Sequence, residues 1–296
     1  LEFRRVLFRS FSHVTPAFAY HEKRDDESEA AFVGRLAAEL EAEFQRLGPE
    51  NVAAFIAEPV VGATAGCVPA PEGYFKAVRE ICNRHGALLI LDEVMCGMGR
   101  TGTLHAWEQE GIAPDIQAVA KGLGGGYQPI GAMLASGSIV DTVRNGSGAF
   151  QHGHTYLAHP LACAAALEVQ KVISEERLLD QVKERGRQLE QRLVERFGNH
   201  RHVGDIRGRG LFWGIELVAD RGTRQSFDPK LKLHQRIKSA AFAGGLGCYP
   251  SGGTADGQRG DHVLLAPPYI ATSGDIDMIV ERLGVAVDSA LKDVGH

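Results

Sequence analysis

Two charged side chains stand at the ends of two short apolar segments. Asp92 ends the run Leu88-Leu89-Ile90-Leu91, and Lys121 follows Ala118-Val119-Ala120 just before a glycine-rich stretch. A charge at the end of a buried strand is costly to place unless it meets a ligand or a partner. In an open α/β sheet, ligands bind outside the carboxyl ends of the strands, which is where both side chains would lie. The pattern therefore predicts a ligand site that combines a carboxylate with an amine.

A carboxylate and a lysine are the two protein groups that pyridoxal phosphate (PLP) chemistry requires. We expect Asp92 to pair with the protonated ring nitrogen of this cofactor, and Lys121 to form an imine with it and later to move a proton. Val94 would lie on the same side of the strand as Asp92 and pack against the ring. Glu58 ends another apolar segment and would join them at the same edge. Spacing alone leaves open that these are ordinary surface charges.

Other motifs nearby suggest different chemistry, and their context argues against each. Gly97-Met98-Gly99-Arg100-Thr101-Gly102 matches the dinucleotide-binding fingerprint, but the segment after it is too broken for the required helix, and the next strand leads to a lysine instead of an acid. Gly122-Leu123-Gly124-Gly125-Gly126 lacks the Lys-Ser/Thr pair of a phosphate-binding P-loop. His152 and His154 have no third ligand at a useful spacing, so no metal site is predicted.

The composition narrows the class of protein further. The chain has 296 residues and a net charge of −5, with acids and bases interspersed, which argues against a nucleic-acid surface. We expect no membrane partner, because no apolar run approaches the length of a membrane span. Five scattered cysteines without a CxxC motif indicate reduced thiols and a cytoplasmic protein.

Alternating helical and strand-like segments predict an α/β fold with a mostly parallel sheet covered by helices. The expected helices of the first half are 28–47 and 72–85, and the expected strands are 52–57, 87–91 and 130–135. The stripe predicted to be buried on the first helix consists of Val33, Ala37, Leu40, Phe44 and Leu47.

The second half predicts a smaller α+β C-terminal domain. Its expected helices are 161–173, one ending near 197, 229–243 and one after 273, and its expected strands are 211–217 and 262–265. The predicted divisions of the chain are a non-native leader over 1–10, a PLP-binding large domain over 11–160 that is incomplete at its N-terminus, connecting helices over 161–194, and the small domain over 195–296.

Several of these segments together resemble the class III (subgroup II) aminotransferases of PLP fold type I. The resemblance covers about residues 11 to 290, and its most specific part is the block from residue 91 to 131. The matching segments are Ala57-Glu58-Pro59-Val60, Leu91 to Gly102, Pro114-Asp115-Ile116, Ala120 to Tyr127, and His152-Gly153-His154-Thr155-Tyr156 with His159-Pro160.

The resemblance implies the roles expected above: Asp92 pairs with the ring nitrogen of PLP, Val94 packs against the ring, and Lys121 forms the imine. It also implies that Thr155 reaches the cofactor phosphate of a neighbouring subunit, and hence a homodimer with shared active sites. Met95 stands where many relatives carry a glutamine that touches the ring hydroxyl, so that contact is not expected in this chain.

Substrate recognition is expected from Glu58 and from an arginine, because a guanidinium pairs with a carboxylate through two parallel hydrogen bonds. Arg259 lies where amine–pyruvate relatives carry a mobile arginine, and Arg207 matches an arginine used in some relatives. We rank Arg259 first. For both arginines a surface charge or an ion pair is the alternative.

The resemblance implies an enzyme that transfers an amino group from an amine or ω-amino acid to a 2-oxo acid such as pyruvate, through pyridoxamine phosphate. A PLP aminomutase or decarboxylase of the same family is one alternative. A catalytically incompetent fragment that acts only as a folding or dimerisation unit is another, because relatives carry a further N-terminal portion with a phosphate-binding turn.

Overall fold

The computed structural model describes residues 11–295, so the predicted leader over 1–10 lies outside the described residues. The described chain divides into two compact units. The first joins the described residues up to Phe55 with Ala70–Leu89, and the second joins Ile56–Pro69 with the described residues from Ile90 onward. All the predicted site residues belong to the second unit.

The first unit is built on two packed helices, α3 (Glu29–Leu47) and α4 (Tyr74–His85), with the short helices α2 (Ala19–Glu22) and η1 (Pro49–Asn51) beside them. The side chain of Ser28 caps α3 by accepting a hydrogen bond from the N–H of Ala31 at 3.2 Å. Gly86 ends α4 in the left-handed region at φ 69°, which glycine adopts without steric cost.

The buried stripe of α3 differs in part from the prediction. The buried side chains are Phe32, Leu36, Leu40 and Phe44, so the prediction is right at Leu40 and Phe44. It is wrong at Val33 and Ala37, which lie one position beyond the buried row, and at Leu47, which is exposed. The reason is geometric, because residues four apart share one helical face and the row set by Phe44 runs back through positions 36 and 32.

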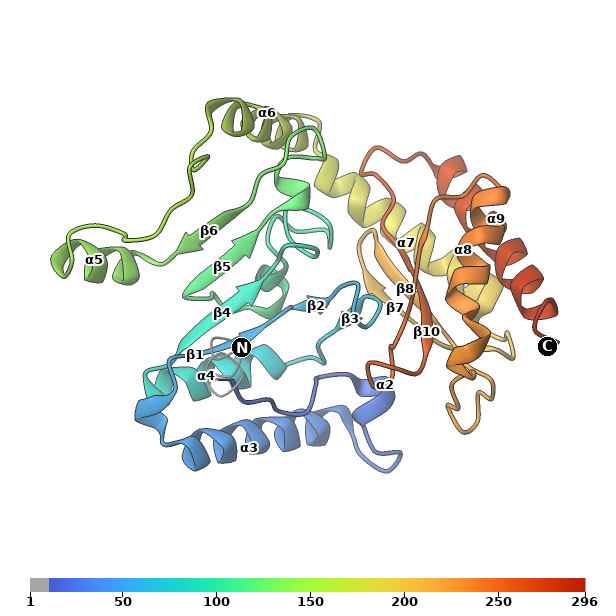
Figure 1. The fold of residues 1–296 in the computed structure, drawn as a ribbon, viewed down its shortest axis with the longest axis horizontal. Helices are drawn as coiled ribbons and strands as arrows, with labels where there is room; N and C mark the ends of the chain where they lie inside the picture. Colours follow the sequence, from blue (N-terminus) through green and yellow to red (C-terminus); the bar gives the residue numbers. More distant parts are fainter. Residues whose placement is uncertain (1–10, 296) are drawn as a thin grey trace. The chain divides into compact units, whose positions relative to one another are not determined.

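A four-stranded sheet in the order β1-β4-β5-β6 carries the strand ends of interest (Figure 1). β4 runs parallel to β5, whereas β5 and β6 are antiparallel. The α/β prediction is confirmed, but the prediction that 52–57 is a buried strand is wrong. Ile56 is 57% exposed, because β1 is an edge strand of the described sheet. The bounds are β1 Ala54–Ala57, β4 Leu88–Asp92, β5 Ile116–Val119 and β6 Ala132–Ala135.

A second, antiparallel sheet in the order β7-β8-β10-β9 forms the C-terminal part of the second unit. Its strands are β7 (Val203–Arg209), β8 (Phe212–Leu217), β9 (Tyr249–Gly252) and β10 (Asp261–Leu265). Three helices pack on it, α7 (Leu178–Phe197), α8 (Leu233–Ala243) and α9 (Ser273–Lys292). They enclose a core that includes Leu189, Phe197, Ile215, Val263 and Leu283.

The helices predicted for the second half of the chain are observed, and the predicted strands at 211–217 and 262–265 are observed as β8 and β10. The strands β7 and β9 were not expected. Glycine and charged residues interrupt the apolar pattern of β7, and β9 has only four residues, including a proline. Both are recognised only through their pairing with β8 and β10.

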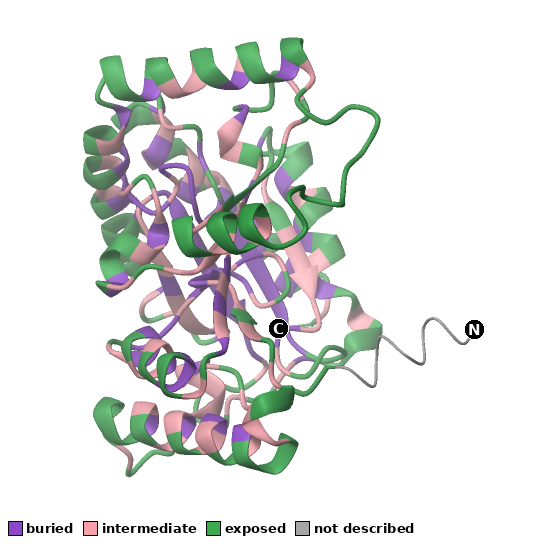
Figure 2. Ribbon diagram, turned by 90° about the vertical axis from the view of Figure 1, so that its left-hand side faces the viewer, coloured by how far each residue is buried: buried purple, intermediate pink, exposed green. Residues whose placement is uncertain are grey.

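The segment between the two sheets is mostly exposed (Figure 2). It contains α5 (Gly137–Asn145) and α6 (Pro160–Glu175). A small hairpin of β2 (Val60–Val61) and β3 (Val68–Pro69) precedes β4 in the second unit. The large apolar side chains exposed along the segment that contains α5 and α6 include Phe150, Tyr156, Leu157, Leu161 and Leu167.

Candidate active site

Asp92 and Lys121 lie at the carboxyl ends of neighbouring parallel strands. Asp92 is the last residue of β4 and is paired with Ala118 of β5, and Lys121 lies two residues beyond the end of β5. The N–H of Glu93 donates to the carbonyl of Ala118 at 2.9 Å, which continues the pairing past the strand end. Both side chains therefore start from the same edge of the sheet, where ligands bind in open α/β sheets.

Glu58 lies close to both of these groups. It follows β1 directly, and its Oε2 accepts a hydrogen bond from the N–H of Gly62 at 2.9 Å. Burial raises the pKa of Glu58, the Gly62 N–H opposes that rise, the charge of Asp92 adds to it, and the charge of Lys121 lowers it. The charges of both Asp92 and Lys121 therefore act on the Glu58 carboxyl group.

The carboxylate of Asp92 is held by the backbone that follows it. The N–H of Val94 donates to Oδ1 of Asp92 at 2.9 Å. This contact fixes the orientation of the carboxylate and leaves Oδ2 to accept a hydrogen bond from a ligand. Asp92 and Val94 are both half-buried, as expected for residues that border a ligand site.

Lys121 begins the short 3₁₀ helix η3 (Lys121–Leu123) with an unusual backbone conformation. Its φ is +42°, in the left-handed region that costs a residue with a Cβ roughly 1–2 kcal/mol. Such a conformation persists only where neighbouring groups hold it, and it occurs preferentially at functional sites. The side chain of Lys121 is exposed, so its amine is accessible to a ligand.

Glu93 has a different function from its neighbour Asp92. Its side chain is fully buried and accepts hydrogen bonds from the N–H groups of Ala106 at 2.7 Å and Trp107 at 2.8 Å. These bonds hold the start of helix η2 (Ala106–Glu110). Burial raises the pKa of Glu93 to about 7. Adjacent side chains on an extended chain point to opposite sides, which is the signal that separates the two acids.

Arg207 is enclosed by protein groups. Its Nε donates to the carbonyl of Gly66 at 2.9 Å, and Nη2 donates to the carbonyl of Ala65 at 2.6 Å. Nη1 donates to the carboxylates of Asp205 at 2.8 Å and Glu216 at 2.7 Å. The residue is only 7% exposed. Every nitrogen of the guanidinium thus has a partner within the protein.

Arg259 is in the opposite situation, on the exposed loop between β9 and β10. Its side chain is 67% exposed and forms an ion pair with Asp256, whose Oδ2 lies 2.7 Å from Nε. The backbone N–H of Arg259 and then its guanidinium lower the pKa of Asp256 to about 2. The guanidinium remains open to solvent and is available to another carboxylate.

Thr155 lies in the exposed segment between α5 and α6. Among the described residues, no hydrogen bond joins it to the other predicted site residues. Glu58, Asp92 and Lys121 therefore all stand at strand ends, and the charges of Asp92 and Lys121 act on Glu58. The expectation that Val94 continues the strand is wrong, because β4 ends at Asp92 and Val94 lies in the turn that follows.

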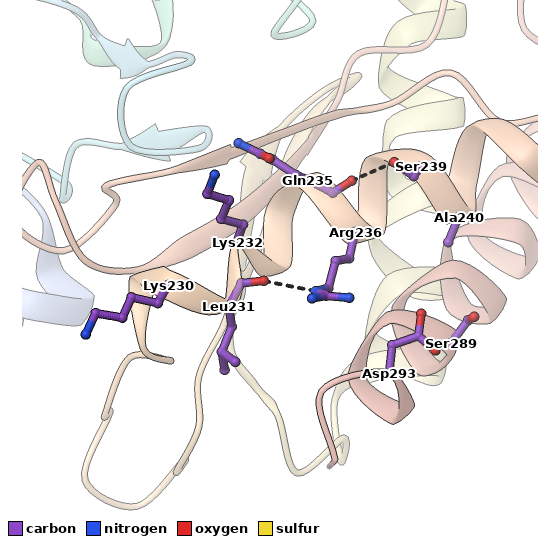
Figure 3. Close-up of a pocket in the computed structure, with 9 residues that line it drawn as sticks. All are labelled: Lys230, Leu231, Lys232, Gln235, Arg236, Ser239, Ala240, Ser289 and Asp293. Atoms are coloured by element: carbon purple, nitrogen blue, oxygen red, sulfur yellow. Dashed lines mark hydrogen bonds between the residues drawn. The ribbon is translucent and has the colours of Figure 1, made fainter.

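A separate cavity of about 600 Å³ lies at α8 and the end of α9 (Figure 3). Lys230, Lys232 and Arg236 line it, but Figure 3 shows the two lysine chains pointing away from each other. The Nε of Arg236 donates to the carbonyl of Leu231 at 3.0 Å. None of the predicted site residues lines this cavity.

Within residues 11–295, no three His, Cys, Asp or Glu side chains gather in a way that would hold a metal ion. Over the same range, no helix has the length and apolar character needed to cross a membrane.

Comparison with known proteins agrees with this geometry. Residues 4–287 match the family model of class III aminotransferases. The chain belongs to the class III aminotransferases. An uncharacterized aminotransferase of Schizosaccharomyces pombe is 49% identical over 97% of the chain, and a diaminobutyrate–2-oxoglutarate transaminase of Halomonas elongata is 36% identical over 93%. The chain spans 62% and 58% of the lengths of these two relatives.

A solved structure extends this likeness to three dimensions. The ω-transaminase of Pseudomonas jessenii, solved in complex with PMP, has a TM-score of 0.88 and 36% identity, and the match covers 96% of this chain and 61% of that one. Class III aminotransferases depend on PLP. The fold and the family predicted from the sequence motifs are therefore confirmed.

Proposed function

We propose that this chain forms part of a PLP-dependent transaminase, in which Lys121 binds the cofactor covalently and Asp92 pairs with its ring nitrogen. The observation that carries the proposal is the placement of Asp92 and Lys121 at the ends of adjacent parallel strands, with Glu58 within the field of both. An acid and an amine at this edge fit the cofactor of the family.

When bound, PLP supplies an electron sink for a carbanion at the substrate carbon. Asp92, oriented by the Val94 N–H, would keep the ring nitrogen protonated and so strengthen that sink. Lys121 would hold the cofactor, and its amine, when free, would move a proton between the substrate carbon and the cofactor carbon. Glu58 would border the substrate side, and Val94 would pack against the ring.

We propose an amine or ω-amino acid as the donor and a 2-oxo acid such as pyruvate as the acceptor. The names of the relatives support an amino-group transfer that involves 2-oxo acids, since the Halomonas elongata enzyme acts with 2-oxoglutarate. For the substrate carboxylate we favour Arg259 over Arg207, because its guanidinium is open to solvent whereas that of Arg207 is enclosed.

We also propose that the protein works as a homodimer in the cytoplasm, with Thr155 contacting the cofactor phosphate of the neighbouring subunit. The exposed apolar side chains around Thr155, including Tyr156 and Leu157, favour burial against another surface. The five cysteines are scattered along the chain without a CxxC motif, which favours reduced thiols and a reducing compartment. Sedimentation equilibrium tests the dimer, and cell fractionation tests the compartment.

Reductive trapping tests the cofactor role directly. The purified chain is incubated with PLP, reduced with borohydride and digested, and the modified lysine is identified by mass. We expect one adduct per chain on Lys121, and none at this position in Lys121→Ala. Lys171→Ala is the matched control, because Lys171 is also an exposed lysine of the second unit. Labelling scattered over many lysines would contradict the proposal.

Product analysis separates the remaining alternatives. A transaminase incubated with an amine and pyruvate yields alanine. A decarboxylase releases carbon dioxide, and an aminomutase returns an isomer of its substrate without consuming pyruvate. A chain that dimerises but gives no Lys121 adduct would be a folding or dimerisation unit instead of a catalyst.

A further inference from the structure

The turn that carries Lys121 is held in place from two sides. Lys121 has a φ of +42°, and Gly125 and Gly126 at the other end of the turn have φ values of +58° and +84°. Glycine adopts this region freely, but lysine does not. The lysine conformation therefore requires contacts that stabilise the whole turn.

Gln170 makes the first of these contacts. It lies on α6, which packs against η3. Its Nε2 donates to the carbonyl of Leu123 at 3.0 Å and lies 3.4 Å from the carbonyl of Gly122. The end of a helical turn leaves carbonyls without partners inside the turn, and a side-chain amide can satisfy them. Gln170 thus binds the end of the turn that Lys121 begins.

Tyr269, in the loop before α9, makes the second contact with the turn. Its hydroxyl donates to the carbonyl of Met98 at 3.0 Å. A Cβ built on Gly122 would lie 3.1 Å from Met98 Cβ and 3.3 Å from the Tyr269 hydroxyl oxygen, so both residues stand directly against the turn. Burial raises the pKa of Tyr269, which keeps the hydroxyl protonated and able to donate.

Arg100 fixes the position of the Tyr269 ring. Its guanidinium carbon lies 4.6 Å from the centre of the ring, a cation–π distance. Nη1 of Arg100 donates to the carbonyls of Leu211 at 3.0 Å and Pro267 at 2.6 Å. The position of Tyr269 therefore follows from the loop after β4 and from the C-terminal sheet.

We propose that Gln170 and Tyr269 are positioning residues, which act together to hold the Lys121 turn in its left-handed conformation and so direct the amine to the Asp92 edge of the sheet. The catalytic consequence rests on the proposed function. The structural consequence does not, since it concerns the turn itself.

Hydrogen–deuterium exchange of the chain without PLP tests the structural part. The amides of Leu123, Gly124 and Gly125 are bonded within the turn. We expect Gln170→Leu and Tyr269→Phe each to speed their exchange by about fivefold. Gln170→Leu removes a hydrogen bond to the turn itself, and Tyr269→Phe removes the hydrogen bond to Met98, which packs against Gly122 of the turn. The matched controls, Gln191→Leu and Tyr249→Phe, should leave it unchanged. Unchanged exchange in both test variants would overturn the proposal.

A donor-retaining variant separates hydrogen bonding from simple packing. Gln170→Lys keeps an N–H donor within reach of the carbonyls and should restore slow exchange, whereas Gln170→Leu keeps the volume and should not. The opposite order, with slow exchange in Gln170→Leu and fast exchange in Gln170→Lys, would show a packing role and contradict the proposal.

The rate of reductive trapping tests the link to Lys121. We expect the Lys121 adduct to form about fivefold more slowly in Gln170→Leu and Tyr269→Phe, with the same final extent at saturating PLP. Unchanged trapping rates would contradict the catalytic link. Absence of the adduct in the unmodified chain would refute the proposed function instead, and the exchange experiment would still decide whether the turn is held as proposed.

Discussion

Arg207 and Arg259 both lie in the C-terminal part of the second unit but have opposite environments. Arg207 lies within β7, is 7% exposed, and donates to two carbonyls and two carboxylates. Arg259 lies on the loop before β10 with a side chain that is 67% exposed and one ion pair to Asp256. An arginine can thus stabilise the fold or bind a ligand, and the number of its donors that protein groups already occupy distinguishes the two uses.

Arg207 and its partners Asp205 and Glu216, called here the Arg207 cluster, also connect the C-terminal sheet to the site. The carbonyls that Arg207 binds belong to Ala65 and Gly66, in the β2–β3 hairpin. That hairpin begins just after Glu58 and includes Gly62, whose N–H binds the Glu58 carboxylate. Arg207 therefore stabilises the segment that positions Glu58.

The largest effect is expected from Arg207→Met. The substitution leaves Glu216, whose side chain is 1% exposed, without its Nη1 partner, and breaking a buried pair in this way costs about 3–5 kcal/mol of unfolding free energy. Urea unfolding followed by the fluorescence of the buried Trp213 measures it. The double variant Arg207→Met with Glu216→Leu should recover part of the loss. Arg259→Met is the control and should unfold like the parent chain.

Acid should weaken the same cluster. His262 is fully buried next to Gly66, and burial, followed by the charge of Arg207, lowers its pKa to about 4. The charge of Glu216 opposes this shift, and His234 adds to it. Because the pKa of a histidine in the unfolded chain is about 6.5, the contribution of neutral His262 to stability is complete above that pH and is lost as the pH falls toward about 4.

His262 should contribute a loss of up to about 3 kcal/mol of unfolding free energy between these pH values, seen as the difference between the parent chain and His262→Gln. Urea unfolding at a series of pH values measures it. His152→Gln, a change at an exposed histidine, is the control. Equal pH dependence in the parent chain and in His262→Gln would show that another group is responsible.

Arg259→Leu is expected to change the unfolding free energy least, but to slow the reaction with substrates that carry a carboxylate. With PLP bound, reaction with β-alanine should slow by about 10- to 100-fold, because one charged hydrogen-bonding partner of the carboxylate is lost. Reaction with n-propylamine, which lacks the carboxylate, should be unchanged. Absorbance of the cofactor follows both. An equal loss with both amines would assign Arg259 to something other than carboxylate binding.

Much of the fold could be predicted because its signals are local. The helix α4, its Gly86 cap and the strand β4 follow from apolar periodicity and from one glycine. The strand β7 could not be predicted, because its sequence Val-Gly-Asp-Ile-Arg-Gly-Arg has no alternation and only pairing with β8 makes it a strand. On α3 the predicted row was right at Leu40 and Phe44 but one position too late at Val33 and Ala37, because several apolar residues compete along the helix and packing against α4 selects among them.

Local sequence patterns were enough to identify the acid and the amine at the strand ends. Asp92 and Lys121 follow apolar strands in β-α-β order, and parallel strands place their carboxyl ends at one edge whatever the loops do. The partners of the long side chains follow only from the tertiary structure. Arg207 meets Gly66, 141 positions away, and Tyr269 meets Met98, 171 positions away. Such partners depend on contacts between distant segments, which local patterns of hydrophobicity and charge do not encode.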